Sequence, residues 1–382
     1  MGTAYTPGLK VTESALIEKT RRLPIKGEIV VKVGDDVKPQ DVVARAHLPG
    51  ELHTVRIAEK MGLEPVELED AILVRKGDSV KAGDILAKKK TFFGLLTAQC
   101  TSPLNGTVEY YSSATGHMGI RGEPRLLEIN AYISGKVSQI MPQEGVTVTT
   151  YGALIQGIFG IGGERQGVIQ RVCASPDEPF TLDKIPSQAE SKILIGGSIV
   201  TSDVLRRLSE MGAKGVVVGG IVDEELTAFL GYEIGIAITG QEEIGLTLVI
   251  TEGFGEMPMA ERTFNLLSKL EGKEASVNGA TQIRAGALRP EVIVPLRAPR
   301  DSDRESEKEV SSRQLNIGTP VRIIRFPYFG KLATVVSLPP EPREIQTGSK
   351  VRMLEAKLLE TGEIVSVPRA NVEIVEGEQI PR

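Results

Sequence analysis

The residues best placed to do chemistry lie in the central third of the chain, where short apolar runs end in glycine turns. Gly-Gly pairs follow Lys192–Ile195 and Gly215–Val218, and a Thr-Glu-Gly turn follows Leu246–Ile250. In an open α/β sheet, ligands bind beyond the carboxyl ends of the strands, which is where these turns would lie. We therefore predict a small-ligand pocket there. Its predicted lining residues are Gly196, Gly197, Gly219, Gly220, Glu252, Gly253, Thr281, Gln282 and Arg284.

The chemistry of this predicted pocket is recognition rather than catalysis. Arg284 would suit a carboxylate or a phosphate, because a guanidinium group binds either through two parallel hydrogen bonds. The segment contains no histidine and no G-x-S-x-G motif, so no nucleophile–base pair is visible. A simpler interpretation stays open, in which the glycine pairs merely end strands and Glu252 pairs with an arginine structurally. We favour a non-catalytic protein and leave the question of an enzyme open.

No metal or cofactor site is predicted. The two cysteines, Cys100 and Cys173, are far apart, and the absence of a C-x-x-C motif excludes iron–sulfur clusters and cysteine-rich zinc sites. The three histidines lack metal-ligand spacing. The glycine-rich stretch 157–167 matches neither G-x-G-x-x-G nor the P-loop pattern. We interpret it as a hinge or a bulged strand at the edge of the N-terminal module.

The elements that would position the pocket alternate between strand and helix patterns. Apolar periodicity predicts helices over 201–211, 223–230 and 258–270, with Ser202 or Asp203 able to cap the first. Alternating strands and helices favour a small open α/β sheet, which we assign to residues 192–296. Its predicted strands are Lys192–Ile195, Gly215–Val218, Ala237–Ile238, Leu246–Ile250 and Val292–Val294.

The N-terminal part contains an internal repeat. Val31–Ala44 and Val74–Ala87 share the frame V-[KR]-x-G-D-x-V-K-x-x-D-x-x-A. Each Gly-Asp pair predicts a tight turn, because glycine tolerates positive φ and aspartate hydrogen-bonds to its own backbone. Ser102–Val108 adds an Asn-Gly hairpin turn. The repeat therefore predicts an all-β module.

This combination resembles the biotinyl/lipoyl fold and its barrel-sandwich-hybrid relatives, above all the hybrid domain of RnfC- and NqrA-type subunits of membrane redox pumps. Similar modules occur in the large subunits of bacterial RNA polymerase. The resemblance implies one β module over residues 24–173, preceded by an N-terminal extension over 1–23. Biotinyl domains carry their modified lysine on a hairpin, and here that position is Leu95, so no attached cofactor is expected. Phe92 and Phe93 beside it are predicted to pack on the next domain or to bind a partner.

A charged linker over 297–314 leads to a third unit over 315–377. Gly318–Val336 resembles a KOW motif in an SH3-like barrel, with Gly330 as the matching turn glycine. That family includes parts of NusG-like transcription factors and ribosomal proteins, and it binds RNA, ribosomal RNA or RNA polymerase. Seven glutamates nearly cancel the basic charge of this unit, which makes docking to protein at least as well supported as binding to nucleic acid. The resemblance implies a basic and aromatic partner surface of Arg322, Arg325, Tyr328, Phe329 and Lys331.

Whole-chain properties limit the function classes. The 382 residues carry a net charge of −5 with a pI of about 5.6, so the chain has no electrostatic footprint for bulk DNA binding and leaves room only for a local basic patch. Neither a signal peptide nor a membrane-spanning apolar run is present, and two lone cysteines are typical of a reducing compartment. We expect a cytoplasmic protein without membrane insertion.

We predict a multidomain α/β and β protein with an N-terminal barrel-sandwich hybrid, a central small open α/β sheet and a C-terminal SH3-like β-barrel. Its predicted function is that of a non-catalytic scaffold docking onto a larger protein or ribonucleoprotein assembly, with the transcription or translation machinery as the suspected partner. The alternative is a small-ligand-binding or enzymatic protein that uses the central pocket, associated as a soluble subunit with a redox complex. Self-assembly into a homo-oligomer is a third hypothesis.

Overall fold

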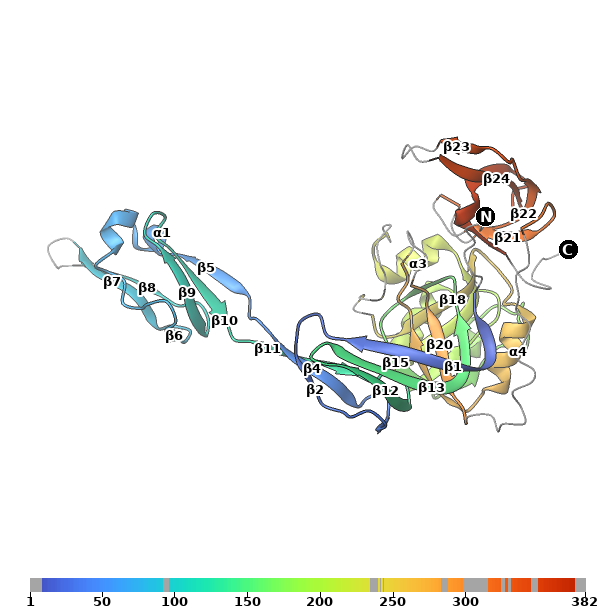
Figure 1. Ribbon diagram of the computed structural model, residues 1–382, viewed down its shortest axis with the longest axis horizontal. Coiled ribbons are helices and arrows are strands. Elements are labelled where there is room, and N and C mark those ends of the chain that lie inside the picture. The colour runs from blue at the N-terminus through green and yellow to red at the C-terminus, as the bar shows by residue number, and fades with distance from the viewer. Residues whose placement is uncertain are drawn as a thin grey trace.

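The computed structural model is rich in β-strands and extended in shape (Figure 1). An arm made of two β modules projects from an α/β body, and a C-terminal β domain lies against that body. Predictions on Phe92, Phe93, Arg284, Arg325, Phe329, the strand Ala237–Ile238 and most of the charged linker lie outside the described residues. The structure describes residues 9–91, 96–233, 240, 242, 244–282, 288–297, 315–323, 327–328, 331–344 and 350–374.

The inner module of the arm, next to the body, has two facing sheets and its own apolar core. Strand β1 pairs with β13, which also pairs with β12, and a second sheet has the order β11-β4-β2. Residues 1–23 were expected to form an extension, but ten of the residues in β1 lie opposite residues of β13, so β1 is an integral strand of the module. The strands are β1 (Val11–Arg22), β2 (Glu28–Ile29), β3 (Asp36–Val37), β4 (Val42–Leu48), β11 (Arg125–Asn130), β12 (Gly135–Met141) and β13 (Gly145–Gln156).

The outer module forms the far end of the arm, and its whole chain is inserted between β4 and β11. It has a separate core that includes Leu86, Met118 and Ile120, all 0% exposed. Its sheets are β5-β10-β9-β6 and the hairpin β7-β8. The elements are β5 (Leu52–Arg56), α1 (Ile57–Met61), the 3₁₀ turn η1 (Pro65–Leu68), β6 (Ser79–Val80), β7 (Ile85–Thr91), β8 (Leu96–Thr101), β9 (Gly106–Ser112) and β10 (His117–Gly122).

The two modules share the same hydrogen-bonding register. The inner hairpin β4-β11 and the outer hairpin β7-β8 have a bulge at the same position, which identifies them as equivalent elements. The outer module is therefore inserted at the tip of the inner module's hairpin, so the single module predicted from the sequence is in fact two nested copies. Three cross-strand pairs of the inner module each have an equivalent pair in the outer module. Val42 opposite Asn130 matches Ile85 opposite Thr101, Ala44 opposite Ile129 matches Ala87 opposite Cys100, and Val37 opposite Gly135 matches Val80 opposite Gly106.

The repeated Gly-Asp turns form as the sequence predicts. Gly34 and Gly77 have φ values of 94° and 96°, in the region that favours glycine. The backbone N–H of Lys32 donates to the Asp35 carboxylate at 2.8 Å, and Arg75 makes the same bond to Asp78 at 2.8 Å. Each turn is thus closed by the aspartate that follows its glycine.

The neck between the modules is a close crossing of two chain segments. A Cβ atom at Gly50 would lie only 2.1 Å from the carbonyl oxygen of Gly122. The Gly122 N–H donates to the Glu51 carbonyl at 2.9 Å, and the Arg121 guanidinium donates to the Gly50 carbonyl at 3.0 Å. The chain that enters the outer module is therefore held directly against the chain that leaves it.

One strand joins the arm to the body. Along one edge, β13 pairs first with β12 and then with β20, while β1 covers its other edge. A single mixed sheet consequently runs from the body into the inner module, in the order β14-β18-β17-β16-β15-β19-β20-β13-β12-β3.

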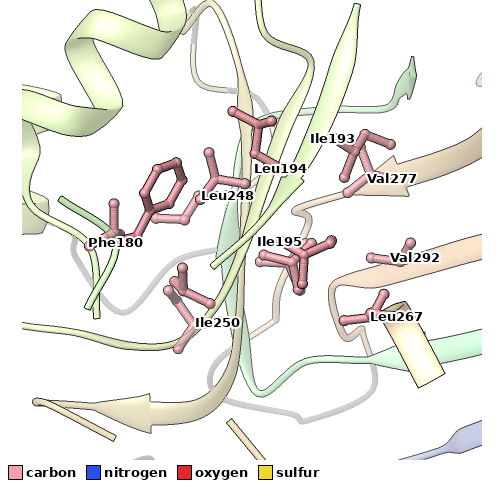
Figure 2. Close-up of a cluster of buried hydrophobic side chains, with 14 of the residues drawn as sticks. Phe180, Ile193, Leu194, Ile195, Leu248, Ile250, Leu267, Val277 and Val292 are labelled. Atoms are coloured by element: carbon pink, nitrogen blue, oxygen red, sulfur yellow. The ribbon is translucent and has the colours of Figure 1, made fainter. Parts of the chain in front are cut away.

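The body is an α/β unit centred on the parallel strands β15 to β18. Phe180, Ile195 and Leu248 belong to its buried core (Figure 2). The predicted helices are confirmed, but neither Ser202 nor Asp203 caps α2, whose N-cap residue is Thr201. Its elements are β14 (Phe159–Ile161), β15 (Arg165–Arg171), η2 (Leu182–Lys184), β16 (Lys192–Ile195), α2 (Ser202–Glu210), β17 (Gly215–Ile221), α3 (Asp223–Leu230), β18 (Thr247–Phe254), α4 (Glu261–Lys269), β19 (Glu274–Asn278) and β20 (Glu291–Pro295).

The glycine-rich stretch 157–167 belongs to this body rather than to the edge of the N-terminal module. It contains β14 and the start of β15, and β15 pairs in parallel with β16. The body therefore begins before residue 192, the boundary predicted from the sequence.

The C-terminal domain is a small six-stranded β unit with its own core, which includes Val335 and Leu354. Strand β21 pairs with β22 and β26, and β24 pairs with β22, β23 and β25. The elements are β21 (Pro320–Ile323), β22 (Leu332–Ser337), β23 (Pro342–Glu344), β24 (Lys350–Leu358), β25 (Ile364–Pro368), η4 (Arg369–Asn371) and β26 (Val372–Ile374).

The neck yields a first prediction. Gly50→Ala should destabilise the outer module by about 2 kcal/mol or more, because its Cβ would overlap backbone that cannot move without opening the crossing. Gly122→Ala is the matched control, since its Cβ would meet Leu104 at an ordinary 3.4 Å. Hydrogen exchange within residues 52–121 of the full chain measures the difference. Equal protection in the two variants would contradict the close crossing.

Candidate functional site

The glycines predicted to line a ligand pocket lie at the carboxyl edge of the parallel strands, but mostly inside them. Gly219 and Gly220 belong to β17, and Glu252 and Gly253 belong to β18, because both strands run further than their apolar runs indicate. Gly196 and Gly197 directly follow β16. The sequence therefore located the correct edge of the sheet.

The space beyond this edge is filled by the chain's own backbone. A Cβ at Gly219 would lie 2.0 Å from the carbonyl oxygen of Met257, and one at Gly197 would lie 2.2 Å from that of Glu178. At Gly220, the carbonyl oxygen of Gly255 would be 2.1 Å away. These glycines are needed for close packing of two loops onto the strand ends.

The backbone donors of these glycines are also used within the chain. The N–H of Gly196 donates to Val217 at 2.9 Å, and that of Gly219 donates to Gly197 at 2.8 Å. Gly220 donates to Ser198 at 2.8 Å, which extends the pairing of β16 with β17. These three N–H groups are therefore paired with carbonyl groups of the chain itself and are not directed at a bound anion.

Glu252 is buried at this edge and binds within the chain through both of its oxygens. Its Oε1 accepts the backbone N–H of Ala260 at 3.0 Å, immediately before helix α4. Its Oε2 accepts a hydrogen bond from Arg322 of the C-terminal domain at 2.8 Å. A carboxylate suits this place, because the amino end of a helix carries partial positive charge. The simpler interpretation, in which Glu252 pairs structurally with an arginine, is confirmed.

Arg322 and Glu252 belong to a cluster of four charged side chains between the body and the C-terminal domain. Arg322 also donates to Glu373, its cross-strand neighbour, at 3.0 Å. Glu373 accepts a second bond, of 2.6 Å, from Arg289 of the body. We call Glu252, Arg289, Arg322 and Glu373 the junction cluster. Its side chains are between 1% and 9% exposed.

The junction cluster is electrically balanced, with two cations and two anions. Burying these groups costs several kcal/mol per ion in desolvation, so the attraction between them is needed to offset that cost. The Nε atom of Arg322 is buried without a hydrogen-bond partner among the described residues. An unmet donor of this kind costs about 1–3 kcal/mol, so the cluster specifies how the domains dock more than it adds net stability.

Two further residues of the predicted pocket, Thr281 and Gln282, form hydrogen bonds elsewhere in the chain. Thr281 is buried, and its hydroxyl donates to the Gly279 carbonyl at 3.1 Å and is 3.4 Å from that of Gly160. Gln282 is half-buried, and its N–H donates to the Leu288 carbonyl at 3.0 Å. Both belong to the loop that packs beside the glycine-rich stretch, and these hydrogen bonds join neither of them to Glu252.

The structure also revises the predicted partner surface of the C-terminal domain. Arg322 is only 2% exposed, so it is not part of an exposed basic surface, contrary to the sequence prediction. Tyr328 is half-buried against the domain core, and Lys331 forms an ion pair with Glu360 at 2.5 Å. The sequence pattern could not show that the Arg322 side chain points into the body rather than to solvent.

A second polar cluster, missed in the sequence, lies where the inner module meets the body. Tyr132 is buried, and its hydroxyl lies 3.4 Å from Glu291, which also binds Lys19 at 2.5 Å. The Arg21 guanidinium lies over the tyrosine ring, 5.4 Å from its centroid. Burial, reinforced by the negative charge of Glu291, raises the pKa of Tyr132 well above that of a free tyrosine.

The two cysteines are buried, and burial raises the pKa of both thiols. A thiol of raised pKa is protonated and therefore a poor nucleophile. Within the described residues, no group of three or more histidine, cysteine, aspartate or glutamate side chains could hold a metal ion. Among the described helices, none is both long enough and apolar enough to cross a membrane.

The junction cluster yields a second prediction. Glu373→Gln removes the anion that lies between two arginines and should destabilise the chain by about 3–5 kcal/mol, because buried positive charge is left uncompensated. Glu360→Gln, which breaks an exposed pair, should change stability by less than about 1 kcal/mol. Urea unfolding of both variants, followed by circular dichroism, tests this ranking. Similar midpoints for both would show that the cluster does not hold the domain in place.

Tyr132 yields a third prediction, on alkaline pH. The pKa of Tyr132 in the folded state is raised above the unfolded value of about 10. The stability gained by keeping the phenol neutral is therefore complete below about pH 10. It is lost as the pH rises from there toward the folded-state pKa. Above about pH 10, the wild type should lose about 1.4 kcal/mol more per pH unit than Tyr132→Phe. Denaturant unfolding at several pH values measures this slope.

Comparison with known proteins does not assign the chain to a family. No family model matches the chain, and no curated protein matches it at a significant level. The function must therefore be argued from the architecture and its contacts.

Proposed function

We propose that the chain is a non-catalytic scaffold that docks onto a larger protein or ribonucleoprotein assembly. The observation that carries this proposal is the nested arm. A complete second module, with its own core, replaces the hairpin tip of the first and so extends away from the body (Figure 1). An outer module placed in this way contributes little to the core of the body, but it extends the reach of the molecule considerably.

The joints of the molecule support the same proposal. The arm is joined to the body through the shared strand β13, and the outer module is joined to the inner one through the crossing at Gly50. The C-terminal domain is joined to the body through the junction cluster. A chain with firm joints between its parts holds two distant surfaces in a defined relation, which is what a scaffold requires.

The two resemblances give the proposal its suspected partner. The shared register of the nested modules is compatible with barrel-sandwich hybrids, and the six-stranded C-terminal domain is compatible with an SH3-like barrel of the KOW type. Both kinds of module occur in the transcription machinery, so we propose that machinery, or the ribosome, as the partner and the cytoplasm as the location. The ligand-binding alternative loses its main support because the chain's own loops fill the predicted crevice.

The proposal is tested by removing the outer module. The neck brings Gly50 and Gly122 into contact, so residues 52–121 can be replaced by a two-residue turn without disturbing β4 and β11. We expect affinity capture with the full chain to recover RNA polymerase or ribosomal proteins, identified by mass spectrometry, and the shortened chain to lose them. Recovery of neither assembly by the full chain, or equal recovery by both chains, would contradict the proposal.

A matched measurement separates the scaffold from the ligand-binding alternative. Thermal shift of the full chain with nucleotides and organic acids should show no stabilisation, because the glycine-lined edge is closed. A clear shift that is lost in Arg284→Ala would instead favour the ligand-binding function.

A further inference from the structure

The nested duplication allows each position of the outer hairpin to be compared with its equivalent in the same chain. The hairpins β4-β11 and β7-β8 share their register, so residues in β7 match residues 43 positions earlier in β4, as Lys88 matches Arg45. Residues that serve the common fold should agree between the copies. Differences in exposed charge therefore indicate what one hairpin does and the other does not.

In the inner hairpin, the cationic position is neutralised. Arg45 forms an ion pair of 2.9 Å with Glu28 on one neighbouring strand and lies opposite Glu128 on the other. The positive charge of Arg45 is thus flanked by carboxylates on both sides.

In the outer hairpin, both carboxylates are absent and the positive charge is increased. Lys88 occupies the place of Arg45, while Ala71 replaces Glu28 and Gln99 replaces Glu128. Lys89 follows, and its ammonium group donates to the carbonyl of Glu67 at 2.7 Å. Lys90 then occupies the place of a histidine, His47. Within the described part of the chain, neither Lys88 nor Lys90 forms an ion pair.

The two free lysines lie on one face of the hairpin together with polar neighbours. Lys88 lies opposite Gln99 and Lys90 lies opposite Thr97, and all four residues are exposed. Alternate residues of a strand point to the same side, about 7 Å apart, so the two ammonium groups form a short row. We call these four residues the distal face.

The composition of the distal face favours a nucleic-acid backbone over a protein surface. Protein interfaces are anchored by aromatic and arginine side chains, and the four described residues of the distal face include neither. Lysine, threonine and glutamine are among the residue types that contact phosphate and sugar groups. A row of two cations along one strand fits one phosphodiester chain better than it fits the groove of a duplex.

We propose that the distal face binds the phosphate backbone of a single-stranded nucleic acid, without reading its sequence. This inference rests on the proposed function, in which the arm reaches into a larger assembly, and it names the chemistry that the arm would meet there. The net charge of −5 is no obstacle, because the distal face is carried away from the body at the end of the arm.

The test is fluorescence anisotropy of the full chain with a labelled single-stranded RNA of about 20 nucleotides, between about 50 and 200 mM salt. For the double variant Lys88→Gln/Lys90→Gln we expect about fivefold or greater loss of affinity at the lower salt concentration. The slope of log K against log salt should become shallower by about 1.4, because each lost phosphate contact on a single strand contributes about 0.7. The control Lys32→Gln/Lys38→Gln removes two exposed lysines of the inner module and should leave the slope unchanged.

A second variant recreates the inner hairpin in the outer one. Gln99→Glu places a carboxylate opposite Lys88, as Glu128 lies opposite Arg45, and should also weaken RNA binding. Its matched control, Thr101→Glu, adds the same charge near the base of the same strand and should weaken binding less.

The outcomes separate this inference from the proposed function. Unchanged RNA affinity in the lysine variant, or binding to vesicles of anionic lipid with none to RNA, would overturn the distal face as a nucleic-acid site. If affinity capture still depends on residues 52–121 in that case, the scaffold proposal stands and only its partner chemistry fails. If the full chain captures no assembly while the lysine variant loses RNA affinity, the scaffold proposal fails and the distal face stands.

Discussion

Strand β13 is the element on which the rest of the structure depends, because it belongs to the arm and to the body at once. On one edge its first residues pair with β12 and its last residues with β20, while β1 pairs along the opposite edge. The arm cannot swing against the body unless this ladder breaks, and every broken backbone hydrogen bond would leave polar groups to be satisfied elsewhere. The direction of the arm is therefore set by sheet pairing rather than by a linker.

The C-terminal domain is fixed by a different kind of contact. Its junction with the body includes buried charges, and such charges gain little net energy after desolvation but strongly penalise any arrangement that leaves one of them unpaired. Two pairs cross between the domains, because Arg322 meets Glu252 of the body and Glu373 meets Arg289 of the body, and the observed placement of the domain satisfies both. This interpretation explains why Glu252 and Arg322, which the sequence assigned to binding sites, are paired with each other inside the chain.

The sequence predicted the local elements well because they depend on local patterns. The Gly-Asp turns, the three helices of the body and most of its strands follow from glycine conformations, apolar periodicity and β-branched runs. The nesting was missed because the second half of the repeat is faint, with Ser102–Val108 and Ala131–Val137 sharing only a glycine and a valine. Insertion at a hairpin tip also leaves no local signature, since β4 and β11 are far apart in the chain.

The predicted ligand pocket at the strand ends was not found, for a related reason. Glycine pairs at strand ends suit a phosphate and suit a close backbone contact equally, because both need the absence of a side chain. Only the positions of Met257 and Glu178 decide between the two, and those residues come from loops without a regular pattern. The sequence shows that Arg322 is charged, but the direction of its side chain depends on how the C-terminal domain docks onto the body.

Two differences between the nested copies fall at opposite ends of the arm. At the proximal end, Tyr132 has a φ of 70° where the outer copy has Pro103, whose ring fixes a negative φ, so the two backbones must differ there. The strain of a non-glycine residue at positive φ, about 1–3 kcal/mol, is offset by burial and by the hydrogen bond of 2.6 Å that Ser276 of the body donates to the Tyr132 carbonyl. At the distal end, the outer copy lacks the carboxylates that neutralise the inner hairpin. One copy has thus diverged where it attaches to the body, and the other where it faces solvent, while the turns and registers that fold both have stayed the same.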